Sequence, residues 1–273
     1  MSKDKKVYYN KSFNVVAGKT VIEERYLSSR TRWHEYTSTL EVPPAPLHID
    51  IELTNFCNLK CVFCQTNHMK RPKGMMSMET FIRIIDECRN IGVDSVKLSL
   101  WGEPTLNKKF MHMVRYARDN SSLILQLNTN ANTMTPAISR GIVEAGLDMM
   151  TISVDGITKE TYEKLRKLGN YERLMRNING LLKAKKEAGS SMPYITLQII
   201  QTKENIHEVK SFVSYWEKLV DRVSVTNIGA TKPEAYIMDL SVREEKKTGR
   251  QPCEQFWQRL SIYWDGTITV CCG

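Results

Sequence analysis

Three of the seven cysteines lie close together in the sequence, at Cys57, Cys61 and Cys64. They follow a short β-branched run, His48–Leu53, so the thiols belong to a loop that leaves the end of a strand. Three thiolates at CxxxCxxC spacing can converge on one point, and they suit a soft metal, either zinc or an iron–sulfur cluster. A structural zinc site needs a fourth ligand, for which His68 is the candidate. A disulfide is disfavoured because a reducing compartment keeps thiols free.

Short β-branched segments alternate with amphipathic segments from residue 46 onwards. Repeated strand–helix units of this kind predict a parallel sheet and an α/β fold, in which functional groups gather at the carboxyl ends of the strands. The expected strands are His48–Leu53, Ser95–Leu100, Leu123–Leu127, Met149–Val154, Ile195–Ile200 and Val223–Thr226, and the expected helices cover residues 78–91, 107–119, 134–145, 171–188 and 205–219.

Two of these helices begin with a capping signal. Ser77 is a plausible N-cap, with Glu79 in the first turn to complement the helix dipole. Asn205, followed three residues later by Glu208, has the form of a capping box.

The first 44 residues have weak periodicity. Phe13–Val16 and Thr20–Ile22 flank Ala17-Gly18-Lys19, which predicts a hairpin. Pro43, Pro44 and Pro46 then predict a linker, because proline cannot continue a helix or a central strand.

The composition is that of an ordinary globular protein, with 273 residues, 41% hydrophobic and 25% charged. The net charge of +9 is spread along the chain. A solvated surface explains this charge better than a nucleic-acid groove does, which argues against a nucleic-acid partner. No apolar run approaches the roughly 18 residues of a membrane span, and the start lacks the apolar region of a secretion signal. We expect a cytoplasmic protein with no membrane partner.

The cysteine loop resembles the signature of the radical S-adenosylmethionine (SAM) superfamily. That signature is CxxxCx-aromatic-C, which Cys57, Cys61, Phe63 and Cys64 match. The resemblance implies that the three cysteines hold a [4Fe–4S] cluster whose remaining iron binds the amino and carboxylate groups of SAM. An electron from the cluster then cleaves SAM to a 5′-deoxyadenosyl radical. It also implies a partial (β/α)6 barrel of the TIM type, open on one side.

The ends of the next strands resemble further motifs of this superfamily, in the same order. Trp101-Gly102-Glu103-Pro104 looks like its GGEP motif, in which the backbone and the acid hold the SAM ammonium, although Trp101 replaces the first glycine. Asn130 stands in a Thr-Asn-Gly-like segment where Ala131 replaces the glycine. The remaining cofactor-binding residues that the resemblance implies are Ser153 and Asp155 in a Ser-x-Asp-Gly segment, and Arg166, which would reach the SAM carboxylate.

Several of these residues also have a plain structural interpretation. The resemblance places Phe63 next to the adenine of SAM, but Phe63 can equally be a packing residue. Asn130 can simply shape its turn. The Asp155-Gly156 pair makes an ordinary turn in many proteins, and Arg166 can be a solvated helix arginine. Cys88 falls on the apolar stripe of its helix and is expected to be a core residue.

The last 23 residues resemble the opening of the SPASM or twitch extension, which binds auxiliary iron–sulfur clusters. Cys253, Gly266 and Cys271 have its spacing, and Leu260–Tyr263 with Thr267–Val270 predict a hairpin. The expected organisation is an N-terminal extension over residues 1–44, a barrel core over 45–235, and a linker with the beginning of the extension over 236–273. Either the chain is a fragment that lacks the remaining ligands, or it is complete and forms no auxiliary cluster.

The expected function is therefore hydrogen abstraction by a radical SAM enzyme, with a flavodoxin or ferredoxin as electron donor. The short N-terminal segment slightly favours a sugar or cyclitol-like small molecule over a peptide or protein substrate. No catalytic acid or base is assigned. The competing hypotheses are a zinc-stabilised basic nucleic-acid-binding module and an inert iron–sulfur scaffold.

Overall fold

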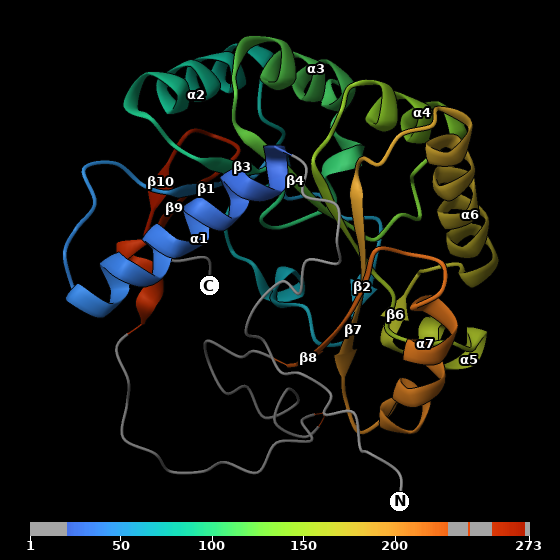
Figure 1. The fold of residues 1–273 in the computed structure, drawn as a ribbon. Coiled ribbons are helices and arrows are strands. Elements are labelled where there is room, and N and C mark those ends of the chain that lie inside the picture. The colour runs from blue at the N-terminus through green and yellow to red at the C-terminus, as the bar shows by residue number, and fades with distance from the viewer. Residues whose placement is uncertain (1–20, 229–239, 241–252, 271–273) are drawn as a thin grey trace, which may run out of the picture.

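A mostly parallel eight-stranded sheet forms the centre of the molecule, with the strand order β10-β9-β1-β3-β4-β5-β7-β8 (Figure 1). The computed structural model describes residues 21–228, 240 and 253–270. The strands of this sheet are β1 (His48–Ile51), β3 (Ser95–Lys97), β4 (Ile124–Thr129), β5 (Met149–Ser153), β7 (Tyr194–Gln201), β8 (Arg222–Asn227), β9 (Arg259–Ile262) and β10 (Ile268–Thr269). All six predicted strands are confirmed, and two more extend the sheet beyond β1.

Helices cover the outer face of the curved sheet and follow one another as an arc in Figure 1. They are α2 (Met78–Ile91), α3 (Phe110–Asn120), α4 (Pro136–Glu144), α6 (Tyr171–Glu187) and α7 (Val209–Trp216), in agreement with the amphipathic segments of the sequence. Their apolar stripes bury Phe81, Met113 and Trp216 against the strands. Among the described residues, no helix is long and apolar enough to cross a membrane.

Side chains alternate along the strands between an apolar outer face and a polar inner face. On β1, Ile49 and Ile51 belong to the hydrophobic core, whereas His48 and Asp50 are buried polar residues on the other side. This follows from the two-residue period of a strand. The inside of the curved sheet is consequently lined by polar groups, unlike the packed apolar interior of a typical closed barrel.

The N-terminal hairpin prediction is wrong where the structure describes it. Residues 1–20 lie outside the described residues, but Val21 and Ile22 begin a helix, α1 (Val21–Thr39). Contacts distant in sequence hold this helix, which overrides a weak local strand preference. Gln258 Nε2 donates to Trp33 O at 3.3 Å and to Thr37 Oγ1 at 2.5 Å.

One of the two capping predictions is confirmed. Ser77 Oγ accepts from Thr80 N at 3.0 Å, as an N-cap should. Asn205 does not cap its helix, because its Oδ1 accepts from Thr202 N at 2.7 Å and its Nδ2 donates to Asp155 O at 2.9 Å. The expected capping box is therefore absent.

Glu208, the other residue of that expected box, caps a different helix. Its carboxylate accepts from Ile157 N at 2.7 Å and from the hydroxyls of Thr158 and Thr161 at 2.5 and 2.6 Å. These groups begin α5 (Lys159–Leu165), a helix that the sequence pattern did not predict. These donors stabilise the Glu208 carboxylate, because burying a carboxylate costs free energy unless it is hydrogen-bonded.

The predicted C-terminal hairpin is present as β9 and β10, with Tyr263 N donating to Thr267 O at 2.9 Å. Strand β9 pairs in parallel with β1, so the hairpin extends the central sheet. The buried Glu52 fixes it in place, because its carboxylate accepts from Arg71 Nη2 at 2.7 Å and from Trp264 N at 3.1 Å. The expected boundary at residues 235 and 236, and Cys271, lie outside the described residues.

We predict that Gly74→Ala destabilises the chain by about 1–3 kcal/mol, because core overpacking has costs of this size. A Cβ at Gly74 would lie 2.4 Å from the Trp264 ring, which packs on this backbone. Urea unfolding of the variant checks the prediction. Gly180→Ala is the control, since nothing lies within 4 Å of its Cβ position, and we expect it to stabilise its helix by about 0.5–1 kcal/mol. Equal stability of Gly74→Ala and wild type would contradict this packing.

Candidate cofactor-binding site

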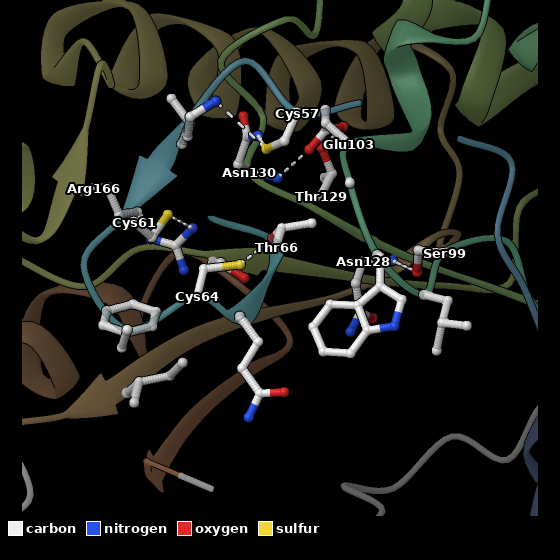
Figure 2. A pocket seen from close by; sticks show the side chains of 18 of the residues that line it. Cys57, Cys61, Cys64, Thr66, Ser99, Glu103, Asn128, Thr129, Asn130 and Arg166 are labelled. Carbon is white, nitrogen blue, oxygen red and sulfur yellow. Dashed lines mark hydrogen bonds between the residues drawn. The ribbon is translucent and has the colours of Figure 1, made fainter. Parts of the chain in front are cut away.

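A cavity of about 570 Å³ opens at the carboxyl ends of the central strands (Figure 2). The loops after β1, β3 and β4 surround it, together with the last residues of β5 and β7. Among the predicted site residues, those that line it are Cys57, Cys61, Phe63, Cys64, Gly102, Glu103, Asn130, Ser153 and Arg166. The structure thus brings together residues that are spread over more than 100 positions of the sequence.

The three cysteines lie on one loop that a small second sheet stiffens. Strand β2 (Lys60–Cys61) pairs antiparallel with β6 (Arg166–Lys167), and Cys61 stands opposite Arg166. The turn closes where Cys64 N donates to Cys61 O at 3.1 Å. All three thiols are free, and none is paired in a disulfide.

Each of the three sulfurs lies within reach of a polar hydrogen-bonding group. Cys57 Sγ accepts from Leu59 N at 3.4 Å, and Cys61 Sγ accepts from Arg166 Nη1 at 3.7 Å. Cys64 Sγ forms its hydrogen bond with the Thr66 hydroxyl. Donors of this kind stabilise negative sulfur and tune the potential of iron–sulfur clusters.

The thiols of Cys57 and Cys61 are protonated at neutral pH in the metal-free chain. Burial raises the pKa of Cys61 to about 11, although the charge of Arg166 opposes the shift. Burial raises the pKa of Cys57 as well. A metal or cluster bound here would displace these protons, because only the thiolate is a ligand.

The donor set fits a cluster with three protein ligands. Three free thiols face one cavity, and polar donors surround the sulfurs. His68, the candidate fourth ligand for zinc, is exposed and does not line the cavity. Within the described ranges, no three His, Cys, Asp or Glu side chains are already placed to hold a metal ion, so the fit rests on the chemistry of the three thiols and on the cavity that they share.

Gly102 allows the loop after β3 to touch the cysteine loop. Its φ is +74°, and a Cβ there would lie 2.5 Å from Thr54 O and 2.6 Å from Phe56 O. Any side chain would therefore collide with backbone, which cannot move aside as a flexible side chain can. The next residue completes the contact, since Glu103 N donates to Phe56 O at 2.8 Å.

The Glu103 carboxylate is almost completely buried between the ends of β3 and β4. Its Oε1 accepts from the hydroxyls of Thr105 and Thr129, both at 2.7 Å, and its Oε2 accepts from Asn130 N at 2.8 Å. Burial raises its pKa, although these donors partly oppose the shift. No described cation forms an ion pair with it, so this buried negative charge faces the cavity without a counter-ion.

Asn130 both shapes its turn and reaches the cysteine loop. Its side chain donates to Asn58 Oδ1 at 2.9 Å and approaches Cys57 Sγ at 3.9 Å. The following residue, Ala131, has a φ of +56°, a conformation that favours glycine. This explains why a glycine is expected there, and it shows that alanine can keep the turn.

Ser153, Asp155 and Arg166 have three different positions relative to the cavity. Ser153 lines it at the end of β5, and its hydroxyl makes no hydrogen bond within the described residues. Asp155 lies behind the cavity wall, where its Oδ2 accepts from Arg166 Nε at 2.7 Å. Burial would lower the pKa of Arg166, but Asp155 and neighbouring groups hold it above the ordinary value, so Arg166 stays charged.

Phe63 lies at the cavity edge, with the Arg166 guanidinium 5.8 Å from the centre of its ring. Sequence reasoning missed the other polar residues of the wall, including Lys97, Ser99 and Asn128. Their signal is present as the alternation of polar side chains along strands that are otherwise buried. Cys253 is exposed and does not line this cavity.

Comparison with known proteins identifies the family. The model of the radical SAM superfamily matches residues 51–213, well over half of the chain. This chain belongs to the radical SAM superfamily. Enzymes of the superfamily bind a [4Fe–4S] cluster and SAM.

Two curated relatives and one solved structure illustrate the similarity. The chain is 28% identical to the tungsten-containing aldehyde ferredoxin oxidoreductase cofactor-modifying protein of Pyrococcus furiosus, over 68% of this chain and 53% of that protein. It is 26% identical to mycofactocin maturase MftC of Mycobacterium tuberculosis, over 67% of this chain and 45% of MftC. The chain therefore spans about half the length of these curated relatives.

The solved structure confirms the fold. SuiB of Streptococcus suis, bound to its precursor peptide SuiA, superposes with a TM-score of 0.67 at 15% identity, over 98% of this chain and 68% of SuiB. At this level of identity the likeness concerns the α/β fold alone.

We predict that Gly102→Ala retains less iron than wild type after anaerobic reconstitution with iron and sulfide. The added methyl group must push the cysteine loop away from the loop after β3, at a cost of about 1–3 kcal/mol. Iron and sulfide analysis of the desalted protein gives the measurement. Gly92→Ala is the matched control, because Gly92 has a similar φ of +78° but nothing within 4 Å of its Cβ position. Equal iron retention by the two variants would show that the close contact does not matter.

Proposed function

We propose that this chain cleaves SAM reductively and uses the resulting radical to abstract hydrogen from a substrate. The observation that carries the proposal is the convergence of Cys57, Cys61 and Cys64 with four further strand ends on one cavity. A protein that used these cysteines only for stability would not need unpaired polar groups facing the same space. Bound together, the cluster and SAM supply the radical chemistry.

The residues around the cavity have distinct roles in this proposal. Cys57, Cys61 and Cys64 hold the cluster. Glu103 attracts the SAM ammonium, because its buried carboxylate has no described cationic partner and accepts only one hydrogen bond at Oε2. Ser153 offers an unused hydroxyl to the ribose or carboxylate of SAM.

Arg166, Phe63 and Asn130 complete the cofactor site. Arg166 remains charged next to Cys61 and offers its remaining N–H groups to the SAM carboxylate. Asp155 is a positioning residue, since it orients the Arg166 guanidinium from behind the wall. Phe63 supplies an apolar surface for the adenine, and Asn130 connects Glu103 with the cysteine loop.

We predict that Cys57→Ala abolishes 5′-deoxyadenosine formation, because two thiols cannot hold the cluster firmly. The reconstituted protein is incubated without oxygen with SAM and a strong reductant, and the nucleoside is measured by chromatography. Cys88→Ala is the control, since Cys88 is a buried helix residue outside the cavity, and we expect it to reduce stability while leaving product formation largely unchanged.

Failure of wild type to form 5′-deoxyadenosine with its cluster in place would contradict the enzyme proposal. That result would favour the inert scaffold. A colourless protein with stoichiometric zinc would instead favour the zinc-stabilised module.

The substrate proposal has two candidates. A small polar molecule, such as a sugar or cyclitol, is favoured by the polar side chains that line the inside of the sheet below the cofactor cavity. A peptide or protein is favoured by the relative named a mycofactocin maturase. We propose the small molecule as the first candidate and a flavodoxin or ferredoxin as the electron donor.

We predict that deuterium passes from a substrate of the right class into 5′-deoxyadenosine, because hydrogen abstraction is the first chemical step. Deuterated amino sugars or cyclitols and deuterated peptides are incubated separately with the reconstituted protein and SAM, and the product is analysed by mass spectrometry. Label from the small molecules supports our first candidate. Label only from peptides would assign the chain to the peptide-modifying group.

We also propose a role for the two cysteines of the C-terminal region. Cys253 and Cys271 would be two of the ligands of an auxiliary iron–sulfur cluster. Other residues would have to supply the remaining ligands, because such clusters are typically held by four cysteines. We propose residues 45–235 as the core, with residues 1–44 and 236–273 as the flanking regions.

A further inference from the structure

A second cavity, of about 500 Å³, lies at the opposite end of the strands from Cys57, Cys61 and Cys64. It is bounded by the amino ends of β1, β3 and β9 and is covered by α1, which crosses these strands in Figure 1. Trp33 of α1 packs against His48 at the start of β1, with ring centroids 6.2 Å apart. The cavity therefore exists only because the N-terminal helix packs beneath the sheet.

Three cationic side chains, Arg30, Lys97 and Arg259, line this cavity from three different elements. Arg30 lies on α1, and its guanidinium stacks 4.0 Å from the centre of the Trp33 ring. Arg30 forms no ion pair or hydrogen bond with any described residue. Partial burial lowers the pKa of Arg30, Tyr26 opposes this shift, and the nearby charge of Arg259 adds to it. Like charges that line one cavity favour an anion bound between them.

Among the described residues, the carboxylate behind this wall is that of Asp50, and it already has partners. Asp50 is fully buried and contacts Lys97 Nζ at 2.6 Å, Arg259 Nη1 at 3.4 Å and His48 Nε2 at 3.3 Å. Burial disfavours its ionised form, but the charge of Lys97 and the hydrogen bond from His48 outweigh this and hold its pKa below the ordinary value. Burial lowers the pKa of His48, so this ring is neutral at pH 7. Asp50 thus pairs with two of the three cations that line the cavity, and Arg30 has no carboxylate partner among the described residues.

We propose that this cavity is a binding site for a small oxyanion, either phosphate or a carboxylate, held mainly by Arg30 and Arg259. The charges of three cations attract the anion, and guanidinium groups match the geometry of both oxyanions. Ser29 and Gln126 add neutral donors, because both line the cavity and neither side chain makes a hydrogen bond within the described residues.

The position of Lys97 connects this site with the cofactor cavity. Its side chain lines both cavities, one at each end of the inner face of the sheet. An anionic group bound near Arg30 and Arg259 would leave the rest of a small molecule directed towards the cysteines. Assigning the anion to the substrate rests on the function proposed above, whereas the anion site itself does not.

The test measures anion binding to the metal-free chain, so it needs neither cluster nor SAM. Inorganic phosphate and succinate are titrated separately into wild type and Arg30→Gln by calorimetry, at low chloride. We expect at least one anion to bind, and Arg30→Gln to weaken it about tenfold, as the loss of one charge-assisted hydrogen bond does. Preference for one anion then distinguishes a phosphorylated ligand from a carboxylated one. Arg176→Gln, which removes an exposed charge on α6, should bind as wild type does.

A second readout locates the anion. Cys253 is exposed and lines the same cavity, whereas Cys57 lines the cofactor cavity. The bound anion should slow the reaction of Cys253 with N-ethylmaleimide, followed by peptide mass spectrometry, and leave that of Cys57 unchanged.

The proposal is overturned if neither anion binds, if Arg30→Gln binds as tightly as wild type, or if Cys253 is not protected. Each of these results would leave 5′-deoxyadenosine formation untouched. Conversely, anion binding to a chain that fails to cleave SAM would support this site and contradict only the proposed enzyme activity.

Discussion

The backbone contact between Gly102 and the cysteine loop is the constraint on which the cofactor site depends. It places the loop after β3 directly on residues 54–56, so that the end of one strand fixes the loop of its neighbour. The Glu103 carboxylate then joins this pair of loops to the end of β4 through Thr129 and Asn130. Three strand ends are thus fixed relative to one another before any cofactor binds. Such preorganisation favours cofactor binding, because little free energy is needed to order the loops when the cofactor binds.

The polar interior of the sheet is tolerated because nearly every buried group has a partner. Asp50, Glu52, Asp155 and Glu208 each accept several hydrogen bonds or ion pairs, as buried carboxylates must. Two charged groups that line the cavities have no oppositely charged partner among the described residues. They are Glu103 at the carboxyl end of the strands and Arg30 at the amino end. Each is the reason for proposing a ligand group of opposite charge there, cationic at one end and anionic at the other.

The sequence predicted the positions of the six central strands along the chain for a physical reason. Short β-branched runs between amphipathic segments indicate parallel strands, and functional residues gather at the carboxyl ends of such strands, so the cysteine loop after β1 could be placed from the residues alone. Glu103, Asn130 and Ser153 were expected from the family resemblance, and they line the same cavity as Cys57. The failures concern contacts between distant residues. Gln258 holds helix α1 through a hydrogen bond to Trp33 O, and the Asn205 side chain donates to Asp155 O instead of capping its helix. No local sequence signal reveals either contact. The same applies to β2 and β6, whose two-residue pairing depends on where Arg166 meets Cys61.

Strand β1 connects the two ends of the molecule through consecutive inward-facing carboxylates. Asp50 gathers Lys97 and Arg259 near the amino end, and Glu52 fixes Arg71 and the backbone of Trp264 near the carboxyl end. Both therefore tie the C-terminal hairpin to β1, one through β9 and the other through its turn. Because the cysteine loop begins directly after β1, the hairpin supports that loop as part of the same sheet. A region expected as the beginning of a separate extension thus contributes to the base on which the three thiols are held.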